Sequence, residues 1–240
     1  MVAIKLYGST VSTCTKRVVT VCKEIGVNYE LVPVDLATGE HKSEVFLEQR
    51  QPFGAVPVLV DEDGTQLYES RAICRYLAAK YGKNSGLLPD TGNVKAYGLF
   101  EQAASIEYST FDPLASGLVW ELAFATAFGF PSDEKLGQKQ LHTLKEKMDG
   151  YERILSKQKY LAGNSFTLAD LFHLPYGAEV KNIDASVMDS KPNVKRWWDE
   201  ISSRPAWKAT ESVSESLKLD DWYIYGVIMP VTPQVHDLAL

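Results

Sequence analysis

The chain has 240 residues, a length that allows one or two domains with a sizeable buried core. Hydrophobic residues make up 45% and charged residues 23%, values that argue against a disordered or fibrous chain. The 31 acidic and 25 basic residues give a net charge of −6, and no basic run stands out. We therefore expect no nucleic-acid partner and no binding to anionic lipid.

The N-terminus lacks the long apolar stretch of a signal peptide, and no window approaches the roughly 18 apolar residues of a membrane helix. The three cysteines, Cys14, Cys22 and Cys74, are odd in number and have no Cys-x-x-Cys spacing. That usage fits a reduced, cytoplasmic compartment rather than a disulfide scaffold. The 4 histidines include no pair at i, i+4, so we expect no metal centre.

Short elements of alternating type fill residues 1–82. We expect strands over 2–7, 29–34, 57–60 and 66–68, and helices from the Ser/Thr-rich stretch 9–15 to Ile25, over 42–50 and over 70–81. Pro33 cannot donate a backbone hydrogen bond, which predicts that the strand around it lies at a sheet edge. The order of elements indicates a small α/β domain.

The pattern changes after residues 83–93, which are rich in Gly, Pro and Asn and which we interpret as a linker. Residues 94–212 are almost wholly helical in pattern and predict an all-α domain. The helices expected in it cover 99–128, with a break near Pro113, then 133–156 and 194–202. Thr167 can cap a further helix, and Asp170 can reach back to it from the third helical position.

Residues 213–240 form a C-terminal extension with an apolar stretch, WYIYGVIM, that is too short to span a membrane. Pro230 and Pro233 exclude a helix through the residues that follow it. We expect a strap packed over the helical domain, and a partner-binding motif is the alternative.

The loop before the first helix is the first place where chemistry could occur. At Ser12 it offers free backbone N–H groups and the positive end of the helix dipole, a combination that favours an anion. Helix capping alone is the alternative explanation for the hydroxyls of this loop. Cys14, in the same turn, could be a nucleophile or an inert buried thiol.

Three other short motifs could bind a ligand. Pro57 follows a Gly-containing loop and begins a strand; a cis bond would leave the backbone before it free to pair with an extended peptide, and an ordinary trans Pro is the alternative. Glu69 suits an ammonium group and Ser70 a carboxylate, although capping also explains Ser70. His41 and Lys42 are two possible donors or a solvated face.

Taken in order, these motifs resemble the glutathione transferases, and specifically the phi class. The resemblance lies in STVSTCTKRV (9–18), GEHKSEVFL (39–47), QPFGAVPVL (51–59), LYESRAICRYLA (67–78), FDPLASGLVWELAF (111–124) and FTLAD (166–170). It covers roughly residues 3 to 210. It implies a thioredoxin-like N-terminal domain with a cis-Pro, an all-helical C-terminal domain, a homodimer, and glutathione as the co-substrate without a metal.

The resemblance also implies a role for individual residues. Ser12 matches the catalytic serine, whose hydroxyl donates a hydrogen bond to the glutathione sulfur, and Phe53 resembles the aromatic residue that inserts into the partner subunit. The implied glutathione-binding residues are His41 and Lys42 at the glycyl carboxylate, Val56 before Pro57 at the cysteinyl unit, and Glu69 and Ser70 at the γ-glutamyl end. The implied wall of the hydrophobic substrate site is made of Val11, Thr13, Tyr108, Trp120 and Phe124.

We therefore expect a glutathione transferase whose thiolate attacks hydrophobic electrophiles, with peroxide reduction as a side activity. Two alternatives stay open: a carrier of bulky apolar ligands with incidental turnover, and a non-catalytic interaction module. The joint presence of Ser12, Glu69 and Ser70 favours the enzyme over the module, but it does not separate the enzyme from the carrier. Cys14 stands where the family more often has a small apolar residue, and it opens the possibility of mixed-disulfide chemistry with glutathione.

Overall fold

A four-stranded mixed sheet forms the centre of the N-terminal domain in the computed structural model, which describes residues 4–212. Its strands are β1 (Ile4–Gly8), β2 (Tyr29–Pro33), β3 (Val58–Val60) and β4 (Gln66–Tyr68), in the order β2-β1-β3-β4. β2 runs parallel to β1, and β3 runs antiparallel to both of its neighbours. Pro33 therefore lies on an edge strand, as predicted.

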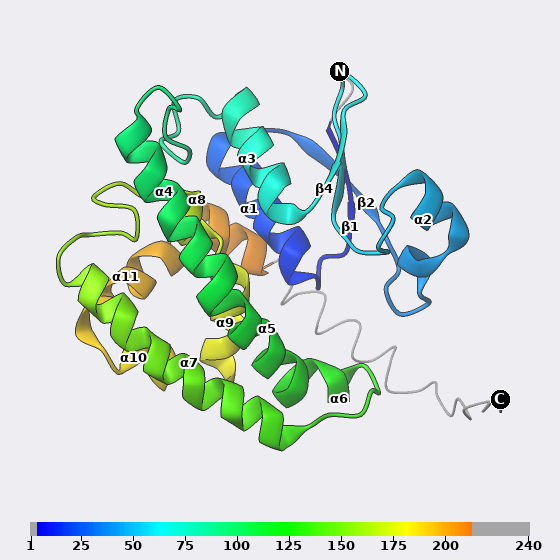
Figure 1. Cartoon of the computed structure of the whole chain (residues 1–240). Helices are drawn as coiled ribbons and strands as arrows, with labels where there is room; N and C mark the ends of the chain where they lie inside the picture. Colours follow the sequence, from blue (N-terminus) through cyan, green and yellow to red (C-terminus); the bar gives the residue numbers. More distant parts are fainter. Residues whose placement is uncertain (1–3, 213–240) are drawn as a thin grey trace.

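Helices cover both faces of this sheet (Figure 1). Leu6 of β1 belongs to the main core, together with α1 (Thr13–Ile25) and α3 (Ser70–Tyr81), which pack against each other. Tyr7, the next residue, packs with Phe46 of α2 (Glu44–Gln49) in a separate cluster on the other face. This alternation follows from the two-residue period of side chains along a strand. The turn η1 (Glu40–Lys42) leads into α2.

A long helical path opens the C-terminal domain. It comprises α4 (Val94–Ile106), the π-helical turn η2 (Glu107–Phe111), α5 (Asp112–Val119), the π-helical turn η3 (Trp120–Phe124) and α6 (Ala125–Ala127). The break expected near Pro113 is therefore wrong, because the backbone stays helical through this residue. Pro113 lacks an N–H and would clash with the preceding turn, and the wider η2 turn directly before it accommodates the ring.

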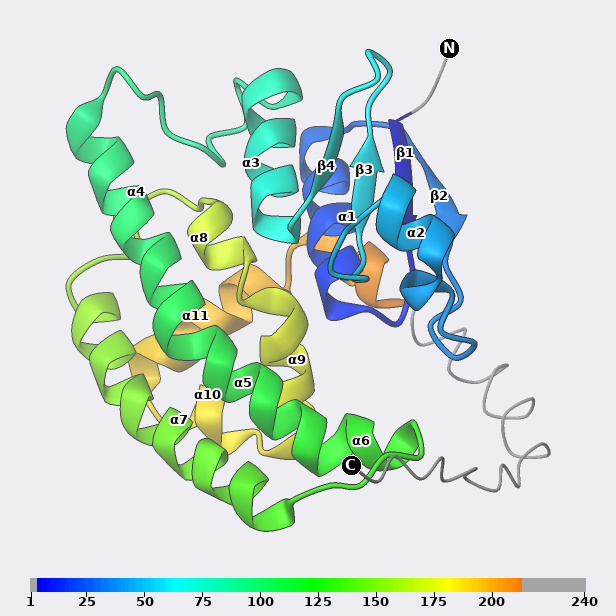
Figure 2. The same ribbon diagram turned by 45° about the vertical axis from the view of Figure 1, so that its right-hand side comes forward.

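The remaining helices complete a layer beside the N-terminal domain (Figure 2). They are α7 (Glu134–Leu155), α8 (Leu168–Leu171), α9 (Leu174–Ile183), α10 (Ser186–Asp189), α11 (Pro192–Ser202) and a final helical stretch over 205–212. The capping box predicted at the start of α8 is confirmed by reciprocal hydrogen bonds between Thr167 and Asp170. Asp170 also accepts from the indole of Trp197 at 2.9 Å, which ties α8 to α11.

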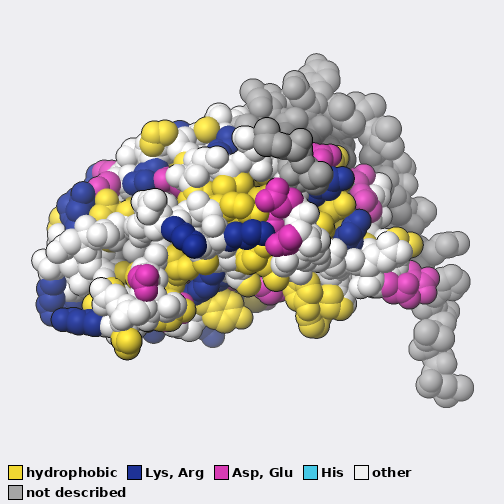
Figure 3. Space-filling model, turned by 90° about the horizontal axis from the view of Figure 1, so that it is seen from above, with side chains coloured by type: hydrophobic (Ala, Val, Ile, Leu, Met, Phe, Trp, Pro, Cys, Tyr) yellow, Lys and Arg dark blue, Asp and Glu magenta, His cyan; other side chains and the backbone are white. Residues whose placement is uncertain are grey.

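One main hydrophobic core runs through both domains, so their arrangement is held by packing as well as by polar contacts. The view from above shows basic and acidic side chains intermixed on that face (Figure 3). None of the helices between residues 4 and 212 combines the length and hydrophobicity needed to span a bilayer. The strap expected over 213–240 lies outside the described residues, as do residues 1–3.

Candidate active site

The sheet topology brings the predicted glutathione-binding residues to one edge. β1, β2 and β4 run in the same direction and β3 runs against them, so the ends of the first three lie beside the start of β3. Ser12 follows β1, His41 and Lys42 follow β2, and Ser70 follows β4, while Val56 precedes β3. Ser12 and Ser70, which are 58 positions apart in the chain, therefore lie at the same edge of the sheet. This convergence makes the edge the candidate active site.

Ser12 is the N-cap of α1. Its Oγ accepts a hydrogen bond from the backbone N–H of Thr15 at 3.2 Å, while its own backbone N–H donates to Ser9 at 3.1 Å. Because the hydroxyl accepts in this contact, its hydrogen stays available for another acceptor. α1 has no acidic residue in its first turn, so its positive dipole end is not neutralised there. The position suits an anion such as a thiolate.

The guanidinium of Arg17, which was not predicted as a site residue from the sequence, lies between the first turn of α1 and the start of α3. Arg17 is completely buried and donates from Nη1 to Ser70 Oγ at 2.8 Å and to Cys14 Sγ at 3.5 Å. Its Nη2 has no hydrogen-bond partner among the residues that the structure describes, although it lies 3.6 Å from Asp112 Oδ1. Arg17 thus joins the first turn of α1 to the start of α3.

Glu107 balances this buried positive charge. It lies fully buried on η2, and it accepts from Arg71 Nε and Nη2 at 2.7 and 2.8 Å, with Arg17 Nη2 at 3.9 Å. Burial alone would raise the pKa of Glu107, but the two guanidinium groups outweigh it and hold the pKa below its usual range. Asp112, at the start of α5, pairs with Arg71 at 2.7 Å. Arginines of the N-terminal domain therefore pair with carboxylates of the C-terminal domain beside the candidate site.

Backbone geometry at two positions also distinguishes this edge. The Val56–Pro57 peptide bond is cis, as the resemblance implies. Glu69 has a φ of 70°, the single left-handed residue other than glycine between residues 4 and 212. A glutamate in this region is strained, and such strain gathers at binding sites, where it directs a side chain or a backbone group toward a ligand. Glu69 is exposed, whereas Ser70 is buried.

The loop over 51–55 packs against His41 and Lys42. Gly54 has a φ of 62°, and a Cβ there would lie 2.7 Å from the carbonyl oxygen of His41, so this approach requires glycine. Lys42 Nζ donates to the Phe53 carbonyl at 3.1 Å. Burial, followed by the charge of Lys42, lowers the pKa of His41, whose buried Nδ1 has no hydrogen-bond partner within residues 4–212. The imidazole therefore has an unused polar atom in the described part of the chain.

Phe53 stands at the tip of that loop with 73% of its surface exposed. The buried side chain of Gln51 holds it in place, because Gln51 Oε1 accepts from the Phe53 N–H at 2.6 Å and from the Ala55 N–H at 3.3 Å. An exposed aromatic ring on a fixed backbone is the geometry expected of an interface anchor.

The residues of the predicted substrate wall come from the start of α1, from η2 and from η3. Val11 and Thr13 flank Ser12, where Val11 is half-buried and Thr13 is buried. Trp120 and Phe124 lie on η3. The ring of Trp120 contacts that of Phe130, with 5.7 Å between the ring centroids. The ring of Phe124 contacts that of Phe128, with 5.9 Å between the centroids. Within residues 4–212, no ring contact joins either of them to Tyr108.

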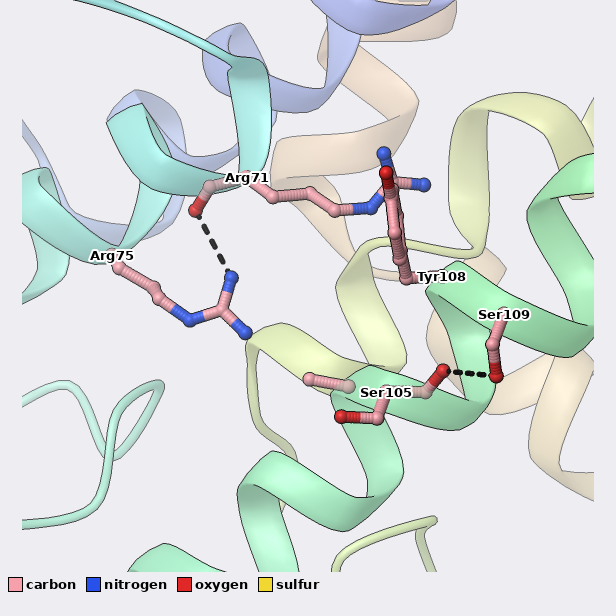
Figure 4. A pocket seen from close by; sticks show the side chains of 6 residues that line it. Arg71, Arg75, Ser105, Tyr108 and Ser109 are labelled. Carbon is pink, nitrogen blue, oxygen red and sulfur yellow. Dashed lines mark hydrogen bonds between the residues drawn. The ribbon is translucent and has the colours of Figure 1, made fainter.

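Tyr108 instead lies at a pocket between α3 and the end of α4. The guanidinium of Arg71 lies over its ring, 5.2 Å from the centroid. The pocket has a volume of about 310 Å³ and is lined by Arg71, Arg75, Ala104, Ser105, Tyr108 and Ser109 (Figure 4). Tyr108 therefore stays a prediction as a substrate-wall residue, and its observed contacts are with α3.

The three cysteines differ in their surroundings. All are free thiols, and Cys14 is the half-buried one. Burial raises the pKa of Cys22 to about 12 and raises that of Cys74 as well, so neither is a nucleophile at neutral pH. In the described part of the chain, no three His, Cys, Asp or Glu side chains gather where they could hold a metal ion.

Comparison with known proteins agrees with this geometry. A sequence model of the glutathione S-transferase N-terminal domain matches residues 6–85, and one of the C-terminal domain matches residues 111–205. Glutathione S-transferase PM239X14 of Arabidopsis thaliana is 65% identical over 198 residues, which are 82% of this chain and 91% of that protein.

Solved structures agree as well. Glutathione transferase F2 of Populus trichocarpa aligns with a TM-score of 0.83 at 37% identity, over 89% of this chain and 99% of that one. Glutathione S-transferase I of maize, solved with an atrazine glutathione conjugate, aligns with a TM-score of 0.81 at 34% identity, over 89% and 99% of the two chains. The chain therefore belongs to the phi class of the glutathione S-transferase family and is a glutathione-transferring enzyme.

Proposed function

We propose that the hydroxyl of Ser12 donates a hydrogen bond to the glutathione sulfur and stabilises it as a thiolate. The observation that carries this proposal is the N-cap geometry, in which Ser12 Oγ accepts from Thr15 and keeps its own hydrogen for the sulfur. A free thiol has a pKa of about 8.5, so little thiolate exists at neutral pH without such help. The thiol proton leaves to solvent when the anion forms.

The thiolate then attacks an electrophilic carbon of a hydrophobic substrate. With an aryl halide, the new carbon–sulfur bond replaces the carbon–halogen bond, and halide departs with the electron pair. The structure of maize glutathione S-transferase I with an atrazine glutathione conjugate supports conjugation as the reaction. With a peroxide, two glutathione molecules would be oxidised to the disulfide while the peroxide is reduced to an alcohol and water.

Glutathione would lie along the sheet edge in an extended form. We assign its γ-glutamyl end to Glu69 and Ser70, its cysteinyl backbone to Val56 before Pro57, and its glycyl carboxylate to His41 and Lys42. The buried Nδ1 of His41, which has no hydrogen-bond partner among residues 4–212, supports the last assignment. The strained backbone of Glu69 supports the first.

The second substrate would sit against Val11, Thr13, Tyr108, Trp120 and Phe124, and this wall would hold it near the sulfur. A carrier role for bulky apolar ligands is compatible with the same wall, and the experiment below separates the two roles. We further infer a homodimer in which Phe53 inserts into the partner subunit, supported by the exposure of its ring. A cytoplasmic location is supported by the three free thiols.

Titration of the bound glutathione thiol tests this proposal directly. Thiolate absorbance is followed across pH for glutathione alone, with the protein, and with a Ser12→Asp variant, and conjugate formation from a model aryl halide is measured in parallel. We expect the bound thiol to ionise well below its free pKa and to form conjugate only with the wild-type protein. Binding without ionisation or turnover would support the carrier role and contradict the role of Ser12.

A further inference from the structure

The pocket between α3 and the end of α4 is distinct from the candidate active site. We call it the arginine pocket; it is lined by Arg71, Arg75, Ala104, Ser105, Tyr108 and Ser109. Of these described residues, none is acidic, none is assigned to glutathione, and Tyr108 alone belongs to the proposed substrate wall. Its volume of about 310 Å³ lies at the lower end of the range for small-molecule sites, which is roughly 300–1,000 Å³.

Both arginines of the pocket keep N–H groups for a ligand, although each is already paired. Arg71 donates from Nε and Nη2 to Glu107, and its Nη2 also lies 2.7 Å from Asp112. Its Nη1 makes no hydrogen bond within residues 4–212. Arg75 uses one N–H of each nitrogen, in bonds of 3.2–3.3 Å to Glu101 and to the carbonyl of Arg71. Because a guanidinium has five N–H donors, each arginine retains two.

The carboxylates that pair with these arginines do not line the pocket. Glu107 is fully buried, and neither Glu101 nor Asp112 is among the described lining residues. The side chains of Arg71 and Arg75 are only 17% and 29% exposed, so both cations are largely removed from water. A partly desolvated cation attracts an anion more strongly than an exposed one, because the local dielectric constant is lower. The lining therefore favours a negatively charged group.

The rest of the lining favours a flat ring attached to that anion. Figure 4 shows Arg71 and Arg75 reaching from α3 toward the helix that carries Ser105 and Tyr108. The ring of Tyr108 is 64% exposed, and the guanidinium of Arg71 lies over it. Tyrosine rings and guanidinium planes both stack on aromatic ligands. A carboxylate, in turn, accepts paired hydrogen bonds from a guanidinium. An aromatic carboxylate meets both conditions, whereas an inorganic anion would leave the exposed ring uncovered.

We propose that the arginine pocket is a second binding site, which holds one small aromatic carboxylate per chain while glutathione is bound. The carboxylate accepts from the guanidinium of Arg75, the Ser105 hydroxyl adds a donor, and the ring of the ligand stacks on Tyr108. No bond is made or broken at this site, so the ligand is held there without being a substrate. The proposal depends on this pocket alone and does not rest on the role of Ser12.

Calorimetric titration of the full-length protein with 2-naphthoate tests the binding. We expect one naphthoate per chain, with the same dissociation constant in the presence and absence of saturating S-methylglutathione, an unreactive analogue of the substrate. 2-Naphthamide, which has nearly the same shape without the charge, should bind about tenfold more weakly or worse. No binding of naphthoate, or equal binding of the amide, would overturn the proposal. Displacement of naphthoate by S-methylglutathione would place it in the active site and would overturn the proposal as well.

Two variants locate the bound naphthoate. Arg75→Gln removes a cation of the pocket and Ser105→Phe fills part of it, so each should raise the dissociation constant by about tenfold or more. The matched controls are Arg153→Gln, at an exposed arginine on α7, and Gln102→Phe, at an exposed residue of α4 outside the lining. Both should bind naphthoate as the wild type does.

Unchanged naphthoate binding in both pocket variants would overturn the proposal. The kcat and the KM for glutathione should stay at their wild-type values in Arg75→Gln and Ser105→Phe, because neither residue is assigned to the active site. Failure of the proposed role of Ser12 would be seen in the ionisation of the bound thiol, which naphthoate binding does not measure. The two proposals can therefore fail independently.

Discussion

Arg17 donates a hydrogen bond from Nη1 to Ser70 Oγ at 2.8 Å, across 53 positions of sequence and between the first turns of α1 and α3. Both side chains are buried, and the hydroxyl of Ser70 accepts in this bond, so its hydrogen is directed away from Arg17. The residue proposed to hold the γ-glutamyl end of glutathione is thus oriented by the helix that carries Ser12. Arg17 therefore links the start of α3 to the helix that Ser12 caps.

Arg17→Met should therefore damage both stability and glutathione binding. The substitution leaves Glu107 and Asp112 without one of their buried cations, and breaking a buried charge network by removing one partner costs roughly 3–5 kcal/mol. It also frees Ser70, so we expect a higher KM for glutathione in addition to a lower urea midpoint. Arg153→Met, which replaces an exposed arginine on α7, is the control. An unchanged glutathione KM in a destabilised Arg17→Met protein would restrict Arg17 to a structural role.

Substitutions of Ser12 separate its two roles, because the same hydroxyl caps α1 and is proposed to donate to sulfur. Ser12→Ala loses both and should lower kcat/KM by about tenfold or more while costing about 1 kcal/mol of stability. Ser12→Asp keeps the cap but replaces the donor by a negative charge, so it should lose activity with little loss of stability. Ser12→Thr keeps both functions and should stay active. Activity and urea unfolding are measured for all three variants and for Cys14→Ser.

Full activity in Ser12→Asp, or loss of activity in Cys14→Ser alone, would contradict the assignment. The second result would move the chemistry to Cys14, whose thiol also lies near Arg17.

Much of the fold was predictable because its signals are local. The strand of Pro33 lies at the sheet edge, Gly26 ends α1 in a left-handed conformation, and Thr167 with Asp170 forms the expected capping box. Each of these depends on residues a few positions apart. The continuous helix through Pro113 was missed because a π-helical turn, which has no strong sequence signature, absorbs the proline.

The candidate site likewise contains some residues that the sequence predicted and others that it did not. Ser12, Glu69 and Ser70 occur in recognisable motifs beside element ends, and the sheet brings their loops to one edge. Arg17, Arg71 and Glu107 were missed as site residues because their pairing crosses between domains and follows no short spacing. A buried charge has to find a partner, but the sequence does not reveal which distant side chain supplies it. Cis geometry at Pro57 was implied by the resemblance alone, since most X–Pro bonds are trans.

Asp61 should make the stability of the enzyme depend on pH. Burial would raise the pKa of Asp61, but hydrogen bonds from Lys80, Tyr76 and Tyr81 outweigh it, so the pKa lies below its usual range. A carboxyl whose pKa is lower in the folded than in the unfolded chain stabilises the fold above the unfolded value of about 3.9. That contribution is lost as the pH falls through the folded pKa.

Asp61→Asn should therefore lower the free energy of unfolding at pH 7 by about 1–3 kcal/mol, because the donors around it lose a charged acceptor. It should also flatten the fall in stability below about pH 4. Urea unfolding from pH 7 down to the acid range measures both effects. Asp199→Asn, at an exposed i, i+4 pair with Lys195, is the control. An unaltered acid profile in Asp61→Asn would show that other carboxylates govern acid unfolding.

Phe53→Ala should weaken the proposed homodimer. The Phe53 backbone is held on both sides, by Gln51 Oε1 at its N–H and by Lys42 Nζ at its carbonyl, so the exposed ring is presented with little conformational freedom. An anchor of this kind loses little entropy on insertion, and its truncation should raise the dimer dissociation constant by about tenfold or more. Sedimentation velocity over a dilution series measures the constant. Val45→Ala, an exposed apolar residue on α2, is the matched control.

Because Lys42 contacts the same loop, a dimer weakened by Phe53→Ala should also bind glutathione less tightly at low protein concentration, where monomers dominate. An unchanged sedimentation profile would exclude Phe53 as the anchor.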